Sequence, residues 1–186
     1  MQYAFVDESE PNGTGHGGPY IMVASMPLVE DLDDLRQRLM RLKPRRQKKL
    51  HWYESVDSVR AATIELISEM PFIHWAVVVE PPGSDSAERR RRSCMERLFH
   101  EVEGLEAVDQ VVMESRGQAD DRRDMRMVSN LRTRRVITGS IRVNHHRGIE
   151  EPLLWVPDAV CGAMNARLAG DSQWSDRLAR QLWVCT

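Results

Sequence analysis

Cysteine is scarce in this 186-residue sequence, and its spacing provides no structural framework. The three cysteines are Cys94, Cys161 and Cys185, and no two of them form a C-x-x-C pair. This excludes an ordinary zinc ribbon and a disulfide-stapled scaffold. No apolar run approaches the roughly 20 residues of a membrane-spanning helix, and the first residues lack the features of a signal peptide. We therefore expect a soluble, cytoplasmic protein with reduced thiols and no membrane contact.

A net excess of charge is also missing. The chain carries 26 basic and 28 acidic residues, a net charge of −2, which excludes a uniformly basic nucleic-acid-binding surface. The basic residues are nevertheless clustered. One run extends from Arg36 to Lys49 without an acidic residue, and two shorter runs cover residues 89–92 and 132–135. A single run of this kind is usually a solvated helix face, whereas three in a near-neutral chain favour a polyanionic partner.

Length and hydrophobic patterning predict one α/β domain over residues 1–186. The hydrophobic content of 41% is ordinary for a folded chain, and a chain of this size buries roughly 70% of its unfolded surface. Strand-like and helix-like runs mix throughout, which predicts a mixed sheet flanked by helices. The expected strands are residues 2–7 and 20–26, paired as a hairpin, then 72–80, 107–114 and 139–144. The expected helices are residues 28–42, a segment between Ser55 and Pro71, 86–103, 121–134 and 157–169.

Four carboxylates fall at the ends of these elements. Asp7 and Glu114 end predicted strands, Glu54 precedes a helix, and Asp158 lies in the first turn of the last helix. Sites in open α/β sheets are built at the carboxyl ends of strands and at nearby helix starts. Each acid also has an ordinary alternative role, as a cap, an ion-pair partner or a surface group.

Convergence of these acids would be costly unless cations or protons occupied the cluster. Two carboxylates about 4 Å apart repel by roughly 4 kcal/mol at an effective dielectric constant near 20. Mg²⁺ and Mn²⁺ prefer oxygen ligands, and two such ions about 3.5–4 Å apart are the arrangement that cleaves phosphodiesters. The pattern therefore predicts a site for Mg²⁺ or Mn²⁺.

Two motifs resemble a known family. The opening YAFVDES, residues 3–9, and the closing LWVPDAVCGA, residues 154–163, are similar to the ends of domain-of-unknown-function family 3800. That bacterial and phage-associated family is predicted to adopt an RNase H-like fold, and the order of the acids resembles the RNase H-like superfamily. The resemblance implies an RNase H-like mixed sheet and metal ligation by Asp7 and Asp158. Glu114 and Glu54 are further candidate ligands because of their positions at the ends of predicted elements.

Two departures from the RNase H pattern accompany the resemblance. Glu114 stands where active RNase H enzymes usually carry Asp, and its longer side chain can still ligate a metal. Residues 28–70 insert two helical segments into the opening of the sheet. Near the acids, Arg116 is a candidate phosphate clamp because guanidinium binds phosphate oxygens in bidentate fashion. His51 is a candidate to orient a water or a phosphate, and burial beside Trp52 is its alternative.

Three further features are secondary. Glu8 is a second candidate ligand, although strand alternation directs it away from Asp7. Asn165 lies seven residues after Asp158, on the same helix face, and is equally consistent with a surface amide. The glycine-rich loop at residues 13–18 lacks the Gly-Lys-Ser/Thr ending of a phosphate-binding loop, which excludes that motif.

The sequence leaves three functions open. The first is a metal-dependent nuclease or related phosphodiester hydrolase acting on DNA or RNA. The second is a non-catalytic RNase H-like module that binds nucleic acid or a protein partner, with a homo-oligomer also possible. The third is a hydrolase of small phosphorylated substrates.

Overall fold

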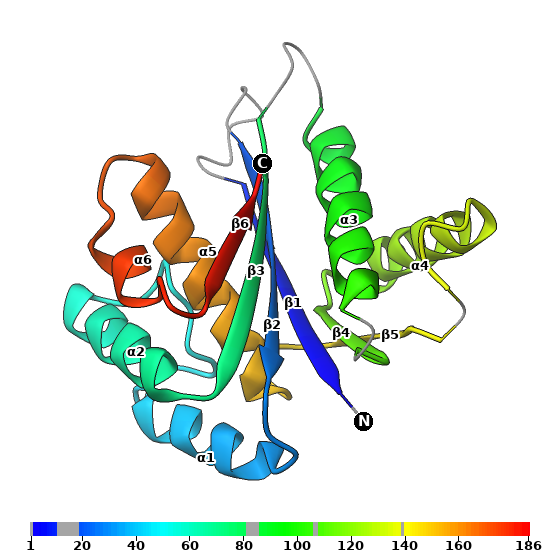
Figure 1. The fold of residues 1–186 in the computed structure, drawn as a ribbon. Helices are drawn as coiled ribbons and strands as arrows, with labels where there is room; N and C mark the ends of the chain where they lie inside the picture. Colours follow the sequence, from blue (N-terminus) through cyan, green and yellow to red (C-terminus); the bar gives the residue numbers. More distant parts are fainter. Residues whose placement is uncertain (1, 11–18, 81–85, 106–107, 139) are drawn as a thin grey trace.

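Six strands form one mixed β-sheet at the centre of the computed structural model (Figure 1). In chain order they are β1 (Tyr3–Ser9), β2 (Tyr20–Pro27), β3 (Phe72–Val79), β4 (Gln110–Glu114), β5 (Arg142–His146) and β6 (Leu182–Cys185). The order across the sheet is β5-β4-β1-β2-β3-β6. The expected hairpin is confirmed, because β1 and β2 pair antiparallel, and β3 continues antiparallel from β2. The pairs β1–β4, β4–β5 and β3–β6 are parallel, which leaves β1 in the interior of the sheet.

The structure describes most of the chain. The described residues are 2–10, 19–80, 86–105, 108–138 and 140–186. The glycine-rich loop at residues 13–18 lies outside them, as do the first residue of the predicted strand 107–114 and the first residue of the predicted strand 139–144.

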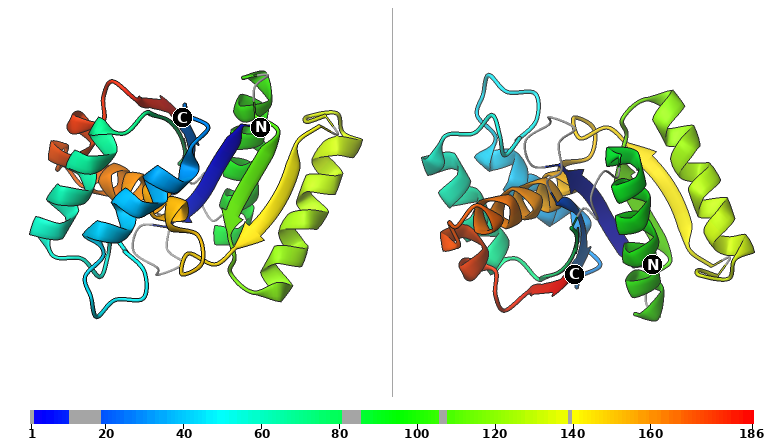
Figure 2. Two further views of the ribbon diagram at one scale, coloured as in Figure 1. Left: turned by 90° about the horizontal axis from the view of Figure 1, so that it is seen from below. Right: turned by 90° about the horizontal axis from the view of Figure 1, so that it is seen from above.

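Helices cover both faces of the sheet (Figures 1 and 2). They are α1 (Leu32–Leu42), α2 (Asp57–Glu69), α3 (Ala87–Gly104), α4 (Gln118–Thr133), a 3₁₀ turn η1 (Pro152–Leu154), α5 (Trp155–Leu168) and α6 (Gln173–Arg177). The helices α1, α2, α5 and α6 pack on one face, and α3 and α4 pack on the other. The expected architecture, a mixed sheet flanked by helices, is confirmed.

Alternation along the strands divides the apolar residues between two cores. Phe5 of β1 faces the core under α1, α2 and α5, whereas Ala4 and Val6 face the core under α3 and α4. All three side chains are at most 2% exposed. The first half of β1 is therefore fixed by packing on both sides of the sheet.

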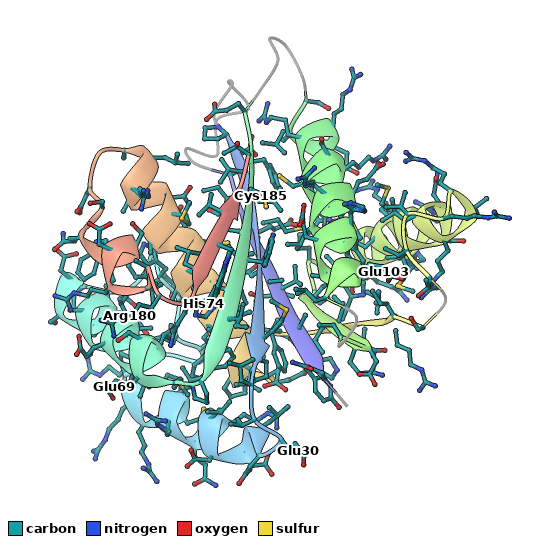
Figure 3. The ribbon with its side chains drawn as sticks, viewed as in Figure 1. Glu30, Glu69, His74, Glu103, Arg180 and Cys185 are labelled. Atoms are coloured by element: carbon teal, nitrogen blue, oxygen red, sulfur yellow. The ribbon has the colours of Figure 1, made fainter. Side chains whose placement is uncertain are left out.

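A polar pair is enclosed in the sheet at β2 and β3. His74 and Ser25 are both fully buried, and Nδ1 of His74 lies 2.9 Å from Oγ of Ser25. Burial lowers the pKa of His74 to about 3, so the ring is neutral at ordinary pH. Figure 3 shows His74 on β3 among the strands, whereas Glu30 and Glu69 lie at the periphery.

The C-terminal elements α6 and β6 were not predicted. Each is very short, with five residues in α6 and four in β6. The edge strand β6 also leaves Trp183 and Val184 exposed, at 44% and 45%, so it shows no alternation of buried and polar residues. The predicted end of the last helix is confirmed, because Gly170 follows α5 with a φ of +96°, a conformation that favours glycine.

The segment between α1 and α2 is anchored on α5 by one tryptophan. The ring of Trp52 packs directly over Gly162, where an ideal Cβ would lie 2.2 Å from the ring. Trp174 contacts the ring edge-on at 5.7 Å, and the guanidinium of Arg60 lies 5.2 Å from its centroid. Arg60 Nε also donates to the carbonyl oxygen of Trp52 at 3.0 Å. The glycine at 162 thus leaves room for the ring of Trp52.

We expect the Gly162→Ala variant to lose about 1–3 kcal/mol of unfolding free energy, because the added methyl group overlaps the Trp52 ring. A loss of this size lowers the Tm by about 2–4 °C per kcal/mol in a chain of this length. Thermal unfolding followed by circular dichroism measures the change. Gly104→Ala is the matched control, since a Cβ at this helical position meets nothing within 4 Å. It should keep or slightly raise the Tm, because alanine lowers the entropy of the unfolded chain. Equal stability of Gly162→Ala and the wild type would contradict the close packing.

Candidate active site

Parallel pairing of β1 and β4 brings two of the predicted acids together. The register aligns Val6 with Met113, so that Asp7 and Glu114 follow at the shared carboxyl end of the two strands. Their side chains share one face with Phe5 and Val112, which belong to the core under α5. Two carboxylates on neighbouring strands therefore face the same helix.

The helix α5 supplies the third acid. Asp158 lies in its first turn, where the helix dipole favours a negative charge. The backbone N–H of Trp52 donates to Oδ2 of Asp158 at 2.8 Å. One turn further, the Cys161 thiol donates to the carbonyl oxygen of Asp7 at 3.6 Å, so that α5 is in direct contact with the carboxyl end of β1.

Asp7, Glu114 and Asp158 line a single cavity of about 320 Å³. Strand β1, strand β4 and helix α5 each contribute one of these carboxylates. The remaining lining residues are Glu8, Ser9, Glu10, Tyr20, Lys49, His51, Tyr53, Ser115 and Arg116. The structure thus brings together three of the four predicted acids, with both Arg116 and His51.

Two cationic side chains enter this cavity from the segment between α1 and α2. Nζ of Lys49 donates to Oε1 of Glu114 at 2.6 Å. Burial alone would lower the pKa of Lys49, but the bond to Glu114 and the negative charges nearby raise it. His51 Nδ1 lies 3.3 Å from Oδ1 of Asp158, a close polar contact that raises the pKa of His51.

Asp7 is the acid without a cationic partner. The N–H of Glu8 donates to its Oδ1 at 2.8 Å, and no ion pair reaches Asp7 from any side chain in the described ranges. Burial raises the pKa of Asp7 well above its ordinary value, and the charges of Asp158 and Glu114 raise it further. The ionised form of Asp7 is therefore destabilised by its surroundings.

Glu8 lies on the opposite face of the sheet, as alternation predicts. Its carboxylate accepts from Nε of Arg91 at 2.7 Å and pairs with Nε of Arg116 at 3.2 Å. Both arginines also bind Asp124, and His145 Nε2 lies 3.2 Å from the same carboxylate. Arg116 is thus held at the rim of the cavity by two carboxylates.

The second basic run is largely structural. Arg90 and Arg91 are only 1% and 4% exposed, and their partners are Glu10 for Arg90 and Glu8 with Asp124 for Arg91. The interpretation of residues 89–92 as a solvated helix face is wrong for these two arginines. The helix places them beneath the end of β1, where they neutralise its outer carboxylates.

Glu54 is exposed and does not line the cavity. Its charge still raises the pKa of His51 slightly. Asn165 lies at the rim, where its Nδ2 donates to the hydroxyl oxygens of Ser9 and Tyr53 at 2.7 and 2.6 Å. Tyr53 is a cavity residue that the sequence did not single out, although it lies within the His51–Glu54 stretch. Lys49 also lines the cavity, and the sequence had marked it only as the end of the first basic run.

The donor chemistry of this cavity fits Mg²⁺ or Mn²⁺. All three acids offer carboxylate oxygens, the ligands that hard divalent cations prefer, and an uncompensated Asp7 beside two other acids favours a cation. Within the described part of the chain, no three acidic, histidine or cysteine side chains are close enough together to hold an ion as they stand. The cationic partners Lys49 and His51 occupy two of the carboxylates in this arrangement.

Comparison with known proteins identifies the fold. No family model matches the chain, and no curated protein matches it. RNase HII of Archaeoglobus fulgidus, solved in complex with PCNA, matches with a TM-score of 0.59 at 16% identity over 91% of this chain and 75% of that one. Ribonuclease H2 of Pyrococcus horikoshii OT3 matches with a TM-score of 0.52 at 11% identity over 91% and 74%.

A third similar structure is Bst-RNase HIII in complex with Mn²⁺. Its TM-score is 0.59 at 14% identity, over 92% of this chain and 56% of that chain. Identities this low establish architecture alone. The chain therefore has an RNase H-like fold, as predicted. Among the described helices, none is long and apolar enough to cross a membrane.

We expect the Asp7→Asn variant to be more stable than the wild type in EDTA. The neutral amide removes the repulsion from Asp158 and Glu114, a gain on the order of 1 kcal/mol that raises the Tm by about 2–4 °C. Thermal unfolding measures the difference, with the exposed Asp34→Asn as a control that gains nothing.

The pH dependence of this gain has a defined sign. Because the pKa of Asp7 is raised on folding, the folded wild type loses stability as pH rises from the ordinary value through the raised pKa. The advantage of Asp7→Asn is therefore complete above that pKa and disappears on acidification, when Asp7 is protonated in both states. A wild type that equals or exceeds Asp7→Asn in stability at neutral pH would contradict the repulsion.

Proposed function

We propose that this protein is a divalent-metal-dependent nuclease, or a related phosphodiester hydrolase, that acts on nucleic acid. The observation that supports this function is the convergence of Asp7, Glu114 and Asp158 in one cavity of an RNase H-like fold. Lys49, His51 and Arg116 line the same cavity, and basic side chains suit a substrate with a phosphate backbone.

Asp7, Glu114 and Asp158 would hold Mg²⁺ or Mn²⁺. When bound, such an ion polarises the phosphate and lowers the pKa of a coordinated water. Glu54 has only an indirect role in this proposal. It lies outside the cavity, and its negative charge contributes to the raised pKa of His51.

The chain's own residues then bind and orient the substrate. Arg116 presents a guanidinium that Glu8 and Asp124 hold in place, and it would engage a phosphate next to the one that is cleaved. His51 would orient the attacking water or a phosphate oxygen. Hydrolysis adds the water oxygen to phosphorus and breaks one P–O ester bond, and the leaving oxygen gains a proton as the water loses one.

Membership of domain-of-unknown-function family 3800 is part of this proposal. The two motifs that carry the resemblance each supply an acid to the cavity. YAFVDES contributes Asp7, and LWVPDAVCGA contributes Asp158. A bacterial origin and a cytoplasmic location stay predictions of that resemblance and of the composition.

The proposal predicts that the purified protein cleaves DNA or RNA in Mn²⁺ or Mg²⁺ and not in EDTA. Asp7→Asn and Asp158→Asn should each lower the cleavage rate by at least about 100-fold, since each removes a metal ligand. Glu54→Gln is the matched control, because it removes an exposed acid outside the cavity and should change the rate only a few-fold. End-labelled oligonucleotides resolved on denaturing gels measure all three.

Equal cleavage by the wild type and Asp7→Asn would indicate a contaminating nuclease and overturn the assignment. Salt-sensitive binding of nucleic acid in EDTA, with no cleavage in either metal, would favour the non-catalytic module. Turnover of a small phosphoester with polymers left intact would favour the third function.

A further inference from the structure

We propose that Lys49 takes the place of one metal ion in this cavity, so that the protein binds a single divalent cation, held mainly by Asp7 and Asp158. This inference rests on the proposed function and differs from the two-ion arrangement that the acids alone suggest. Three features of the described residues support it. The Lys49–Glu114 pair is confined, Asp7 has no cationic partner among the described side chains, and the formal charges of the cavity favour one ion.

The Lys49–Glu114 pair is confined by its surroundings. Nζ and Oε1 are 2.6 Å apart, and the two side chains are only 28% and 19% exposed. The backbone of Gly148 lies directly behind them, since an ideal Cβ there would be 2.7 Å from Glu114 Oε1 and 3.2 Å from Lys49 Cδ. Gly148 is itself fixed by Trp155, whose Nε1 donates to its carbonyl oxygen at 2.6 Å. An ion at Glu114 would have to displace the ammonium group from an enclosed position.

The opposite side of the cavity lacks such a fixed cation. Asp158 accepts the N–H of Trp52 at 2.8 Å and lies 3.3 Å from Nδ1 of His51, with no lysine or arginine paired to it among the described residues. The Asp7 carboxylate accepts only the N–H of Glu8 among the described contacts. These two acids come from α5 and β1, which are in contact where the Cys161 thiol meets the carbonyl oxygen of Asp7. A divalent cation would therefore reduce the electrostatic repulsion most if it bound between Asp7 and Asp158.

Formal charge favours the same number of ions. The formal charges of the three carboxylates and of the Lys49 ammonium, which is bound to Glu114, sum to −2, the charge of one divalent ion. The other charged groups around the cavity compensate one another, because Glu8 and Asp124 pair with Arg91 and Arg116, and Glu10 pairs with Arg90. A second divalent ion would leave a surplus of +2 at short range in a partly buried site.

Mn²⁺ titration tests the inference without relying on activity. The electron paramagnetic resonance signal of free Mn²⁺, with calorimetry as a second measurement, gives the number of ions bound per chain. We expect one ion for the wild type and two for Lys49→Met, which frees Glu114 while keeping the length of the side chain. Lys49→Arg, which keeps the charge, should bind one. The exposed neighbour Lys48→Met is the matched control and should also bind one.

Circular dichroism establishes that each variant is folded, and Lys49→Gln replaces Lys49→Met if the latter is not. Two ions bound by the wild type, or one ion bound by the folded neutral variant, would overturn the role of Lys49 and leave the proposed function intact. A wild type that binds no Mn²⁺ and cleaves nothing would overturn both.

Discussion

Repulsion among the carboxylates at the carboxyl end of β1 is the constraint on which the rest of the site depends. Parallel pairing with β4 and packing against α5 bring Asp7, Glu114 and Asp158 to one cavity, and nothing in their own geometry neutralises them. The pKa of Asp7 is raised by burial and by both neighbours. A polypeptide retains such an arrangement only when other groups compensate it, so the surroundings of these acids explain much of the remaining structure.

Compensation comes from both faces of the sheet. On one face, the segment between α1 and α2 delivers Lys49 to Glu114 and His51 to Asp158, and Trp52 fixes that segment by packing over Gly162. This segment belongs to the connection between β2 and β3. That connection therefore supplies Lys49 and His51 to the site. On the other face, the buried Arg91 neutralises Glu8 and Asp124.

The sequence predicted the strand-end and helix-start acids because their positions follow from local patterns. Alternation directs Asp7 and Glu8 to opposite faces, and the last helix begins close to Asp158 whatever it packs against. The pairing of Lys49 with Glu114 was beyond sequence reasoning, since the two residues are 65 positions apart and their contact depends on how the insertion folds. The same limit applies to Arg90 and Arg91. From composition alone, a run of arginines is predicted to be exposed to solvent. Only the tertiary structure shows the carboxylates that allow Arg90 and Arg91 to be buried.

The sequence predicted most of the fold but not the edge strand β6. Short apolar runs identified the strands β1 to β5, and apolar residues at helical spacing identified the helices α1 to α5. The half-exposed β6 has too few residues for a pattern. A crystal grown in Mn²⁺ and measured for anomalous scattering tests the central claim most directly. The account predicts one anomalous peak in contact with Asp7 and Asp158, with Lys49 still bound to Glu114. Anomalous density only at sites remote from Asp7 would contradict it.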